Sequence, residues 1–338
     1  MITVTAAIIE KNGRILAARR KSGSHLAGFW EFPGGKLEQG ETEEECLARE
    51  LLEEFDITCI VGNFFGESVY DYGSKVIRLL GYHVRHVSGS FYCRDHDRIA
   101  WLPVHELQSL KWAPADIPLV RQLQKEEQIR STLAYYRDNA PDYVRETIAF
   151  ECHNDLRQHF VNLLAPNSLI LDLGCGSGRD SRYFLDQGHR VLATDAVSEI
   201  ADCAAQYIGQ PVRVQLAEEL AEVETYDAVW ASASLPHIPR SRIIDTFRRI
   251  IDALKPGGIW YMSFKKGETE CQDRKLRFYN NYTIPLMHRL LSRFPQIKVL
   301  EISESSSQLR GKDQVWINTL LTKKPAIDSP YRIIQKRR

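Results

Sequence analysis

The sequence predicts an α/β protein of two domains, the second built around a mostly parallel sheet. Its 338 residues exceed what one hydrophobic core usually holds. In the second half, short apolar runs alternate with helical windows, which is the pattern of parallel strands joined by helices. Before them, Leu119 to Arg137 is helical and highly charged, with no strand pattern on either side. We therefore place the domain boundary near residue 128.

The composition excludes several classes of protein. Lys and Arg together number 44, as do Asp and Glu, so no bulk positive field holds the protein on a nucleic acid. No apolar run approaches the roughly 20 residues of a membrane span, and the first residues read as a strand rather than an export leader. We expect a cytoplasmic protein. The seven cysteines are scattered without a C-x-x-C pair, which favours reduced thiols over disulfides or structural zinc.

The first domain is expected to begin with a hairpin. Apolar runs at Thr3–Ile9 and Ile15–Ala18 flank Asn12-Gly13, a pair that favours a two-residue hairpin turn. Further short strands are expected at Val76–Val84 and Ile99–Leu102.

Between the hairpin and these strands the sequence predicts an acidic helix. Thr42 and Glu45 form a capping box at its start. Glu50, Glu53 and Glu54 follow at spacings i, i+3 and i+4, so they share one helix face. Like charges at this spacing destabilise a bare helix, and we therefore expect a hard divalent cation, Mg²⁺ or Mn²⁺, between them. The alternative is an acidic helix that simply faces solvent.

The segment from Gly35 to Ile57 resembles the Nudix box, G-x5-E-x7-R-E-U-x-E-E-x-G-U, in which U is an aliphatic residue. It departs at one fixed position, where Asp56 replaces the glycine. Because Asp tolerates a left-handed backbone better than most residues, we expect the turn to survive. The resemblance narrows to the MutT-type branch, which hydrolyses nucleoside triphosphates. It implies an α/β/α sandwich with a mixed sheet for residues 1–128.

The same resemblance implies roles in catalysis. Glu50 and Glu54, with the carbonyl of Gly34, would ligate the metal, and Glu53 would activate the attacking water. The three carboxylates can exchange these roles, so Glu53 is also a candidate ligand. Water would attack a phosphorus atom of the triphosphate and release a nucleoside monophosphate and pyrophosphate.

Four other positions bear on the nucleotide. Arg20 falls where these enzymes place a phosphate-binding arginine, and Asp116 lies in a stretch that resembles their base-recognition loop. Each is otherwise an ordinary surface charge. Asp accepts a hydrogen bond when ionised and donates one when protonated, so Asp116 does not fix the base. Asp95 and Asp97 are available as a further acid, and their role stays open.

The second domain is expected over residues 129–324, followed by a basic tail at 325–338. Helical windows separate its strands. The strand candidates are Leu169–Leu173, Arg190–Thr194, Ala228–Ala231 and Ile259–Phe264.

The first of these strands runs into a glycine loop, and an acid ends the next. Gly174, Gly176 and Gly178 let the backbone approach a ligand at the carboxyl edge of the sheet, where Asp195 can hold the hydroxyls of a ribose. A nicotinamide dehydrogenase has a similar arrangement. However, the loop reads G-x-G-x-G rather than G-x-G-x-x-G, and Asp172 precedes it by two residues.

Together with the runs Tyr226–Ala231 and Leu254–Gly258, this loop resembles the ordered motifs of class I S-adenosylmethionine-dependent methyltransferases. The resemblance implies a Rossmann-like fold with a mostly parallel sheet and S-adenosyl-L-methionine as cofactor. Another adenine compound is the alternative ligand, and His237 is either a general base or a structural histidine. The implied cofactor contacts are Gly174 and Gly176 to the methionine portion, Asp172 to its amino group, Asp195 to the ribose and Glu218 to the adenine.

Basic residues suggest the nature of the methyl acceptor. Lys265 and Lys266 end a strand at the edge where acceptors enter this fold, and Arg310 and Lys312 lie in the loop before the final strand, with a further basic segment at 274–277. We expect an anionic acceptor, with a phosphate or carboxylate bound by Lys265 and Arg310. The alternative is a basic loop that is simply solvated.

The sequence therefore predicts a bifunctional enzyme whose partners are a nucleotide substrate and a small methyl acceptor. The alternative is a methyltransferase with a nucleotide-binding regulatory Nudix domain.

Overall fold

The computed structural model describes residues 1–149, 154–309 and 312–325. The chain divides into two compact units, Met1–Glu127 and Gln128–Arg338. None of the helices in the described ranges is long and apolar enough to cross a membrane. Arg310 and the expected basic tail, from residue 326 onward, lie outside the described residues.

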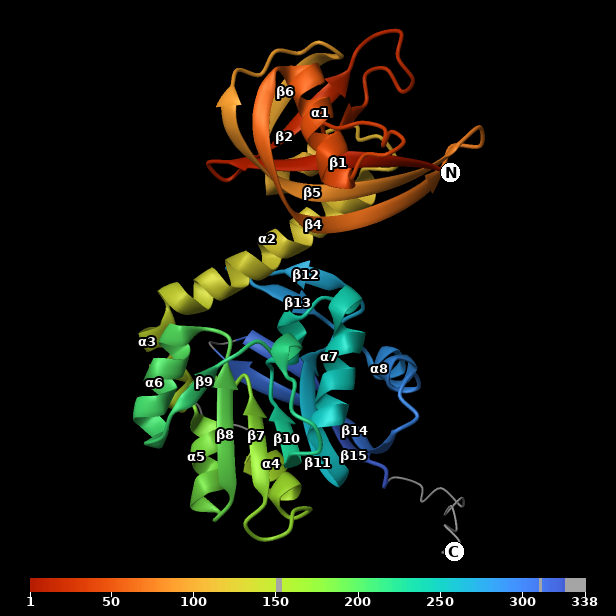
Figure 1. Ribbon diagram of the computed structural model, residues 1–338. Coiled ribbons are helices and arrows are strands. Elements are labelled where there is room, and N and C mark those ends of the chain that lie inside the picture. Colours follow the sequence, from red (N-terminus) through yellow and green to blue (C-terminus); the bar gives the residue numbers. More distant parts are fainter. Residues whose placement is uncertain (150–153, 310–311, 326–338) are drawn as a thin grey trace, which may run out of the picture. The chain divides into compact units, whose positions relative to one another are not determined.

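The first unit is built on a mixed sheet with the order β3-β2-β1-β5-β4, and β6 pairs with β2 (Figure 1). Strands β1 and β5 run parallel, whereas the other pairs are antiparallel, as the resemblance implied. The elements are β1 (Ile2–Lys11), β2 (Arg14–Arg20), β3 (Trp30–Glu31), α1 (Glu43–Phe55), β4 (Ile57–Asp71), β5 (Val76–Gly89), β6 (His96–Pro103), η1 (Val104–Ser109) and the start of α2 (Ile117–Asp138).

Side chains of β1 point alternately into two hydrophobic cores, one on each face of this sheet. Ala6 faces a core that includes Leu119 of α2, and Ala7 faces a core that includes Leu51 of α1. Side chains of successive strand residues point to opposite faces, so the sheet is covered on both sides. The α/β/α sandwich is therefore confirmed.

Local turns in this unit follow the sequence closely. Asn12 and Gly13 have φ values of 54° and 71°, as a two-residue hairpin turn requires between β1 and β2. Helix α1 begins with both hydrogen bonds of the capping box at Thr42. It ends at Asp56, which has φ 58° and donates its N–H to the carbonyl of Leu52. The predicted left-handed turn is confirmed.

The second unit contains a sheet of seven described strands in the order β14-β15-β11-β10-β7-β8-β9. Strands β11 to β9 in this order run parallel, and β14 and β15 add an antiparallel edge, so the mostly parallel sheet is confirmed. Its strands are β7 (Leu169–Leu173), β8 (Arg190–Asp195), β9 (Val212–Val214), β10 (Tyr226–Ala231), β11 (Leu254–Lys265), β14 (Ile297–Leu309) and β15 (Lys312–Lys323).

Helices join these strands and a short hairpin stands apart from the sheet. The order of the strands changes direction between β7 and β10, and ligands bind at such switch points outside the carboxyl ends of the strands. The other elements are α3 (Ala140–Ile148), α4 (Asn154–Val161), α5 (Arg179–Asp186), α6 (Ser198–Ile208), η2 (Ala217–Glu219), η3 (Leu235–His237), α7 (Arg240–Ala253), β12 (Glu270–Gln272), β13 (Phe278–Asn280) and α8 (Ile284–Leu291).

Candidate active sites

The acidic face of α1 is held together by an arginine. The Arg49 guanidinium donates to Glu41 at 2.6 Å, to Glu50 at 3.0 Å and to Glu53 at 3.2 Å. The Glu53 side chain is 60% exposed, whereas that of Glu50 is 16% exposed. Arg49 therefore offsets part of the repulsion that the spacing of these acids creates.

Glu54 lies deeper than the other two acids. Burial raises its pKa to about 8, and the charges of Glu31, Glu50 and Asp95 add to the increase. The backbone N–H of Gly34 donates to its carboxyl group, but its buried Oε2 has no hydrogen-bond partner. Glu54 is thus a carboxyl group beside three other acids with too few donors around it.

The residues present fit a hard divalent cation. No three His, Cys, Asp or Glu side chains in the described ranges already converge as a metal centre. Nevertheless, carboxylates are ligands that Mg²⁺ takes in proteins, and the unpartnered oxygen of Glu54 lies near other carboxylates, Glu50 among them. A cation at Glu50 and Glu53 would compete with Arg49 for the same oxygens.

Two glycines allow this arrangement. A Cβ on Gly34, whose φ is +150°, would lie 2.1 Å from the Thr5 carbonyl oxygen. A Cβ on Gly35 would lie 2.0 Å from the carboxyl carbon of Glu50. Both positions therefore require glycine for close approach of β1 and of the carboxylate helix.

Arg20 and Asp116 occupy different surroundings. The Arg20 guanidinium donates to Glu31 and to the carbonyl of His25, at 2.6 Å each, and its side chain is 30% exposed. Asp116 is buried and accepts a hydrogen bond from the Phe32 N–H at 2.8 Å, so it is not a surface charge. Burial, with the charge of Glu31, raises the pKa of Asp116 well above its usual range.

Sequence reasoning missed Glu31 and His96, which contact each other at 2.8 Å beside these groups. Glu31 stands in the run that carried the family resemblance, but nothing in the sequence pairs it with a histidine 65 positions away. Asp95 and Asp97, whose role the sequence left open, also have different surroundings. Asp95 contributes to the raised pKa of Glu54, whereas Asp97 forms an ion pair with Arg19 at 2.7 Å.

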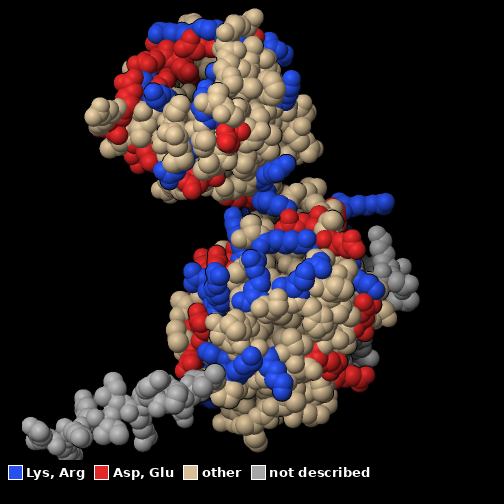
Figure 2. Space-filling model, turned by 90° about the vertical axis from the view of Figure 1, so that its right-hand side faces the viewer, with Lys and Arg blue, Asp and Glu red and all other residues tan. Residues whose placement is uncertain are grey.

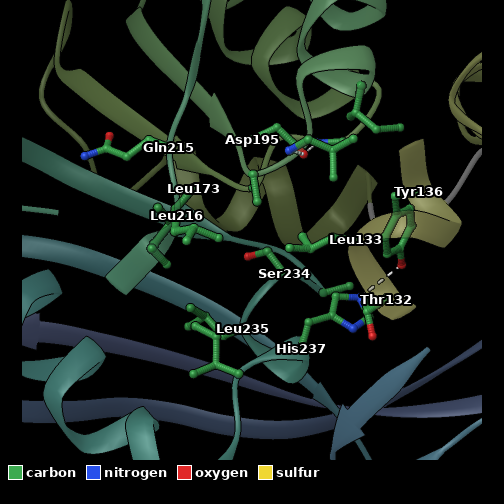
Figure 3. A pocket seen from close by; sticks show the side chains of 18 of the residues that line it. Thr132, Leu133, Tyr136, Leu173, Asp195, Gln215, Leu216, Ser234, Leu235 and His237 are labelled. Atoms are coloured by element: carbon green, nitrogen blue, oxygen red, sulfur yellow. Dashed lines mark hydrogen bonds between the residues drawn. The ribbon is translucent and has the colours of Figure 1, made fainter. Parts of the chain in front are cut away.

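A cavity of about 920 Å³, counted to its open mouth, lies in the second unit at the switch point of the sheet. Figure 3 shows side chains from several loops and from α2 around it. Of the predicted cofactor residues, Gly174, Gly176, Asp195 and Glu218 line it, and Asp172 does not. The other lining residues include Ile129, Thr132, Leu133, Tyr136, Tyr143, Gln215, Leu216, Ser234, Leu235 and His237.

The glycine loop and Asp195 form one wall of this cavity. The Asp195 carboxylate accepts hydrogen bonds from the backbone N–H groups of Gly176 and Val197, at 3.0 Å each. Burial raises the pKa of Asp195 to about 6, although these hydrogen bonds act in the opposite direction. A Cβ on Gly174 would lie 2.4 Å from the Cβ of Ser234, so glycine is required where the two loops meet.

Asp172 lies behind the cavity wall. It is 2% exposed and accepts a hydrogen bond from the Ser181 hydroxyl at 2.6 Å. Burial, followed by the charge of Asp180, raises its pKa to about 8. Glu218 faces the cavity and forms an ion pair with Arg242 at 3.6 Å.

His237 is fixed by two hydrogen bonds. Its Nδ1 lies 2.7 Å from the Phe278 carbonyl, which only accepts, so Nδ1 carries the hydrogen. Its Nε2 therefore accepts from the Tyr136 hydroxyl at 3.0 Å (Figure 3). Burial lowers the pKa of His237 to about 4, and the imidazole is neutral near pH 7.

The basic residues near the cavity differ in how their charges are used. Lys265 Nζ lies 3.3 Å from the centre of the Tyr279 ring, and burial, then Arg277, lowers its pKa to about 8. Arg277 pairs with Asp273 at 2.8 Å and Lys266 pairs with Glu304 at the same distance. In the view of Figure 2, Lys and Arg side chains form a group in the upper part of the second unit.

Comparison with known proteins assigns each unit separately. Residues 1–130 match the family described as NUDIX domain, and residues 170–258 match the family described as Methyltransferase domain. The chain is similar to CTP pyrophosphohydrolase of Escherichia coli, with 40% identity over 120 residues, 36% of this chain and 89% of the relative. It is also similar to a putative 8-oxo-dGTP diphosphatase 2 of Mycobacterium tuberculosis, with 38% identity over 116 residues, 33% of this chain and 81% of the relative.

The chain is also similar to a solved structure, the 1,6-didemethyltoxoflavin-N1-methyltransferase of Burkholderia thailandensis. It is 23% identical, with a TM-score of 0.48, and covers 60% of this chain and 89% of that one.

Proposed function

This chain belongs to the Nudix family through its N-terminal domain and carries a methyltransferase domain behind it, and we propose that it is a bifunctional enzyme with one active site in each. The first site hydrolyses a nucleoside or deoxynucleoside triphosphate to a monophosphate and pyrophosphate. The second transfers the methyl group of S-adenosyl-L-methionine to a small anionic acceptor.

The acidic face of α1 carries the proposal for hydrolysis. Glu50, Glu53 and Glu54, with the Gly34 carbonyl, would hold Mg²⁺, which when bound neutralises phosphate oxygens. Glu53 is the most exposed of the three acids, and it accepts the proton of the attacking water. The oxygen of that water forms a bond to a phosphorus atom, and the bond from this phosphorus to the oxygen that bridges the α- and β-phosphates breaks.

Two residues outside α1 bind the rest of the nucleotide, and a third supplies a further acid. The half-buried Arg20 guanidinium attracts the phosphates. Burial raises the pKa of Asp116, which favours the protonated carboxyl group, and in that form Asp116 offers an O–H donor to the nucleobase edge. Asp95 serves as the further acid, because its charge already acts on Glu54.

The names of the relatives suggest the first triphosphates to test, CTP and 8-oxo-dGTP. With Mg²⁺, release of pyrophosphate and the nucleoside monophosphate supports the proposal. Release of orthophosphate would show that a different bond breaks, and the assignment of a pyrophosphohydrolase would be wrong.

The cavity in the second unit carries the proposal for methyl transfer. A side chain at Gly174 would collide with Ser234, so glycine keeps the loop open on the side of the cavity. We assign this open loop to the methionine portion of the cofactor. Asp195 binds the ribose, Glu218 the adenine, and Asp172 acts on the amino group from behind the wall. S-adenosyl-L-methionine supplies the methyl group when bound, and Tyr136 and His237 line the same cavity.

Lys265 supports an anionic acceptor. Within the described part of the chain, no carboxylate lies at ion-pair distance from its Nζ, although the side chain is largely buried. Arg310 remains a candidate for the same role from the sequence. Assays of methyl transfer to matched charged and neutral compounds test this, together with Lys265→Glu and Arg310→Glu. Preference for neutral acceptors, or indifference to both variants, would refute it.

One observation favours the alternative of a regulatory Nudix domain. Arg49 already binds Glu50 and Glu53, and Glu54 holds a proton near neutral pH. A domain that stays in this state would bind nucleotides without hydrolysing them. Nucleotide-dependent changes in S-adenosylhomocysteine affinity, without product release, would favour this alternative.

A further inference from the structure

Glu31 is the point where three parts of the proposed hydrolase site meet. Its Oε2 accepts from Arg20 at 2.6 Å, and its Oε1 accepts from His96 at 2.8 Å. Its side chain is 17% exposed. After burial, Glu31 is the leading charged contribution to the raised pKa values of both Glu54 and Asp116. The Glu31 carboxylate thus lies next to Arg20, which is proposed to bind phosphate, to the acidic face of α1 and to Asp116, which is proposed to recognise the base.

His96 holds Glu31 from the interior of the domain. Its side chain is 2% exposed, and its ring stacks on Phe55, with centroids 5.1 Å apart and planes 16° apart. A carboxylate oxygen accepts hydrogen bonds, so Nε2 of His96 is the donor to Glu31. The buried Nδ1 has no hydrogen-bond partner. The only described hydrogen bond of this imidazole is therefore the one to Glu31.

The two donors to Glu31 differ in rigidity. Arg20 has a long, partly exposed side chain, which binds Glu31 through Nη1 and the His25 carbonyl through Nε. His96 begins β6 and packs against the last residue of α1, so its position is fixed by two elements of the core. Without His96, Glu31 would rely on Arg20 alone, in a region already crowded with acids.

We propose that His96 is a positioning residue for triphosphate binding and hydrolysis, which anchors Glu31 and through it sets the position of Arg20. This inference rests on the proposed hydrolase function. Residues that orient metal ligands through a hydrogen bond typically matter 10–100-fold for affinity or activity, and we expect an effect of the same order for His96. Because Arg20 is assigned to phosphate binding, we expect the loss to fall mainly on KM.

The test compares two substitutions in the full-length chain with Mg²⁺ and CTP or 8-oxo-dGTP. His96→Leu removes the N–H donor and should lower kcat/KM by roughly 10- to 100-fold, mainly through KM. His96→Gln keeps an N–H donor and should stay within about threefold of the wild type. His105→Leu is the matched control, since His105 is 77% exposed on η1. A His96→Leu variant as active as the wild type, or a His96→Gln variant as impaired as His96→Leu at a normal melting temperature, would overturn the proposal.

A double-mutant cycle separates positioning from a general effect on the fold. In a Glu31→Gln background, His96→Leu should change kcat/KM less than about threefold, because the two residues act through one hydrogen bond. Full multiplication of the two losses would contradict the proposal.

A binding measurement keeps the proposal separate from hydrolysis itself. Calorimetry with a non-hydrolysable methylene analogue of CTP should show roughly tenfold weaker binding to His96→Leu even if the wild type releases no product. Unchanged affinity refutes the role of His96. Normal binding by the wild type without pyrophosphate release refutes only the proposed hydrolysis, and no binding by the wild type removes the triphosphate site and with it the role of His96.

Discussion

The partners of each buried acid decide whether it keeps its charge. Burial raises the pKa of Asp172 to about 8 and that of Asp195 to about 6. Burial acts on Asp180 in the same way, but the charges of Arg179 and Arg157 outweigh it and lower the pKa. In the described residues, Asp172 and Asp195 form no ion pair, and both are assigned to ligand binding. A bound ligand would provide the compensation that the protein provides for Asp180.

This difference predicts a pH dependence of stability. The folded state holds the proton on Asp172 up to about pH 8, whereas the ordinary pKa of Asp is 3.8. Between these values the folded state binds more protons than the unfolded state, so the free energy of unfolding falls as pH rises. Asp172→Asn removes this contribution. Its melting temperature should therefore decline less between about pH 5 and pH 8 than that of the wild type, as measured by calorimetry. Parallel curves would show that Asp172 is ionised throughout.

Glu53 is assigned to the attacking water. Glu53→Gln should reduce triphosphate hydrolysis at least about 100-fold, because a positioned general base contributes that much or more. S-adenosylhomocysteine affinity should not change, since the residue belongs to the other domain. Glu44→Gln, at an exposed position on the same helix, is the control. Hydrolysis at the wild-type rate in Glu53→Gln would remove this residue from the site.

Asp195 is assigned to the ribose of the cofactor. Asp195→Ala should weaken binding by about 1–3 kcal/mol, the scale of a charge-assisted hydrogen bond. Asp202→Ala on α6 is the matched control, because Asp202 is exposed and does not line the cavity. Calorimetry with S-adenosylhomocysteine measures both affinities, and equal values would exclude Asp195 from the binding site.

Some residues that line the sites could be predicted from the sequence, and others could not. Glycines and acids next to strand ends were found because strand, loop and acid follow one another along the chain. Tyr136 meets His237 across 101 positions, and Thr132 accepts from the Phe278 N–H across 146. Glu31 and His96 were missed for the same reason. Such pairs depend on the tertiary packing of distant elements, and a single sequence contains no local signal for them.

Among the elements, α1 carries its own start and stop signals. The residue after it, Asp56, occupies a left-handed conformation at φ 58°, which costs a non-glycine residue roughly 1–2 kcal/mol. Asp56→Gly should therefore raise the free energy of unfolding by about 1 kcal/mol, and the branched Asp56→Val should lower it. Denaturant unfolding measures both. A destabilising Asp56→Gly would mean that the Asp56 side chain, through its ion pair with Arg94, determines the turn. A stabilising Asp56→Val would mean that the left-handed backbone at this position carries no strain.

Periodic elements could be predicted, and irregular ones could not. The β1–β2 hairpin, α1 and the strands β7, β8, β10 and β11 have local apolar patterns, and the structure has them at or near the expected residues. Strand β4 spans fifteen residues, but Gly62 and Gly66 and several register shifts interrupt its alternation. Strand β3 has only two residues, which are a strand because they pair with β2. Neither has a clear period of its own.

For the whole chain, the proposed boundary near residue 128 falls within α2. Leu119, Val120 and Leu123 of this helix pack in the first domain's core, whereas Thr132 and Tyr136 line the cavity of the second unit. Fragments 1–128 and 129–338 each keep their own set of contacts, so each should fold alone. Fragment 1–116 lacks the three apolar residues and should be markedly less stable. If either longer fragment is soluble only with its partner, the two-domain description is wrong.

We propose two separate active sites for this chain, and the full-length protein is the form in which to test them. The measurement is pyrophosphate release from CTP, 8-oxo-dGTP and the other common triphosphates with Mg²⁺, in the absence of S-adenosyl-L-methionine. We expect at least one triphosphate to yield pyrophosphate and its monophosphate without the methyl donor. A chain that binds triphosphates and releases no pyrophosphate, while its affinity for S-adenosylhomocysteine changes, would contradict two separate active sites and show a regulatory domain instead.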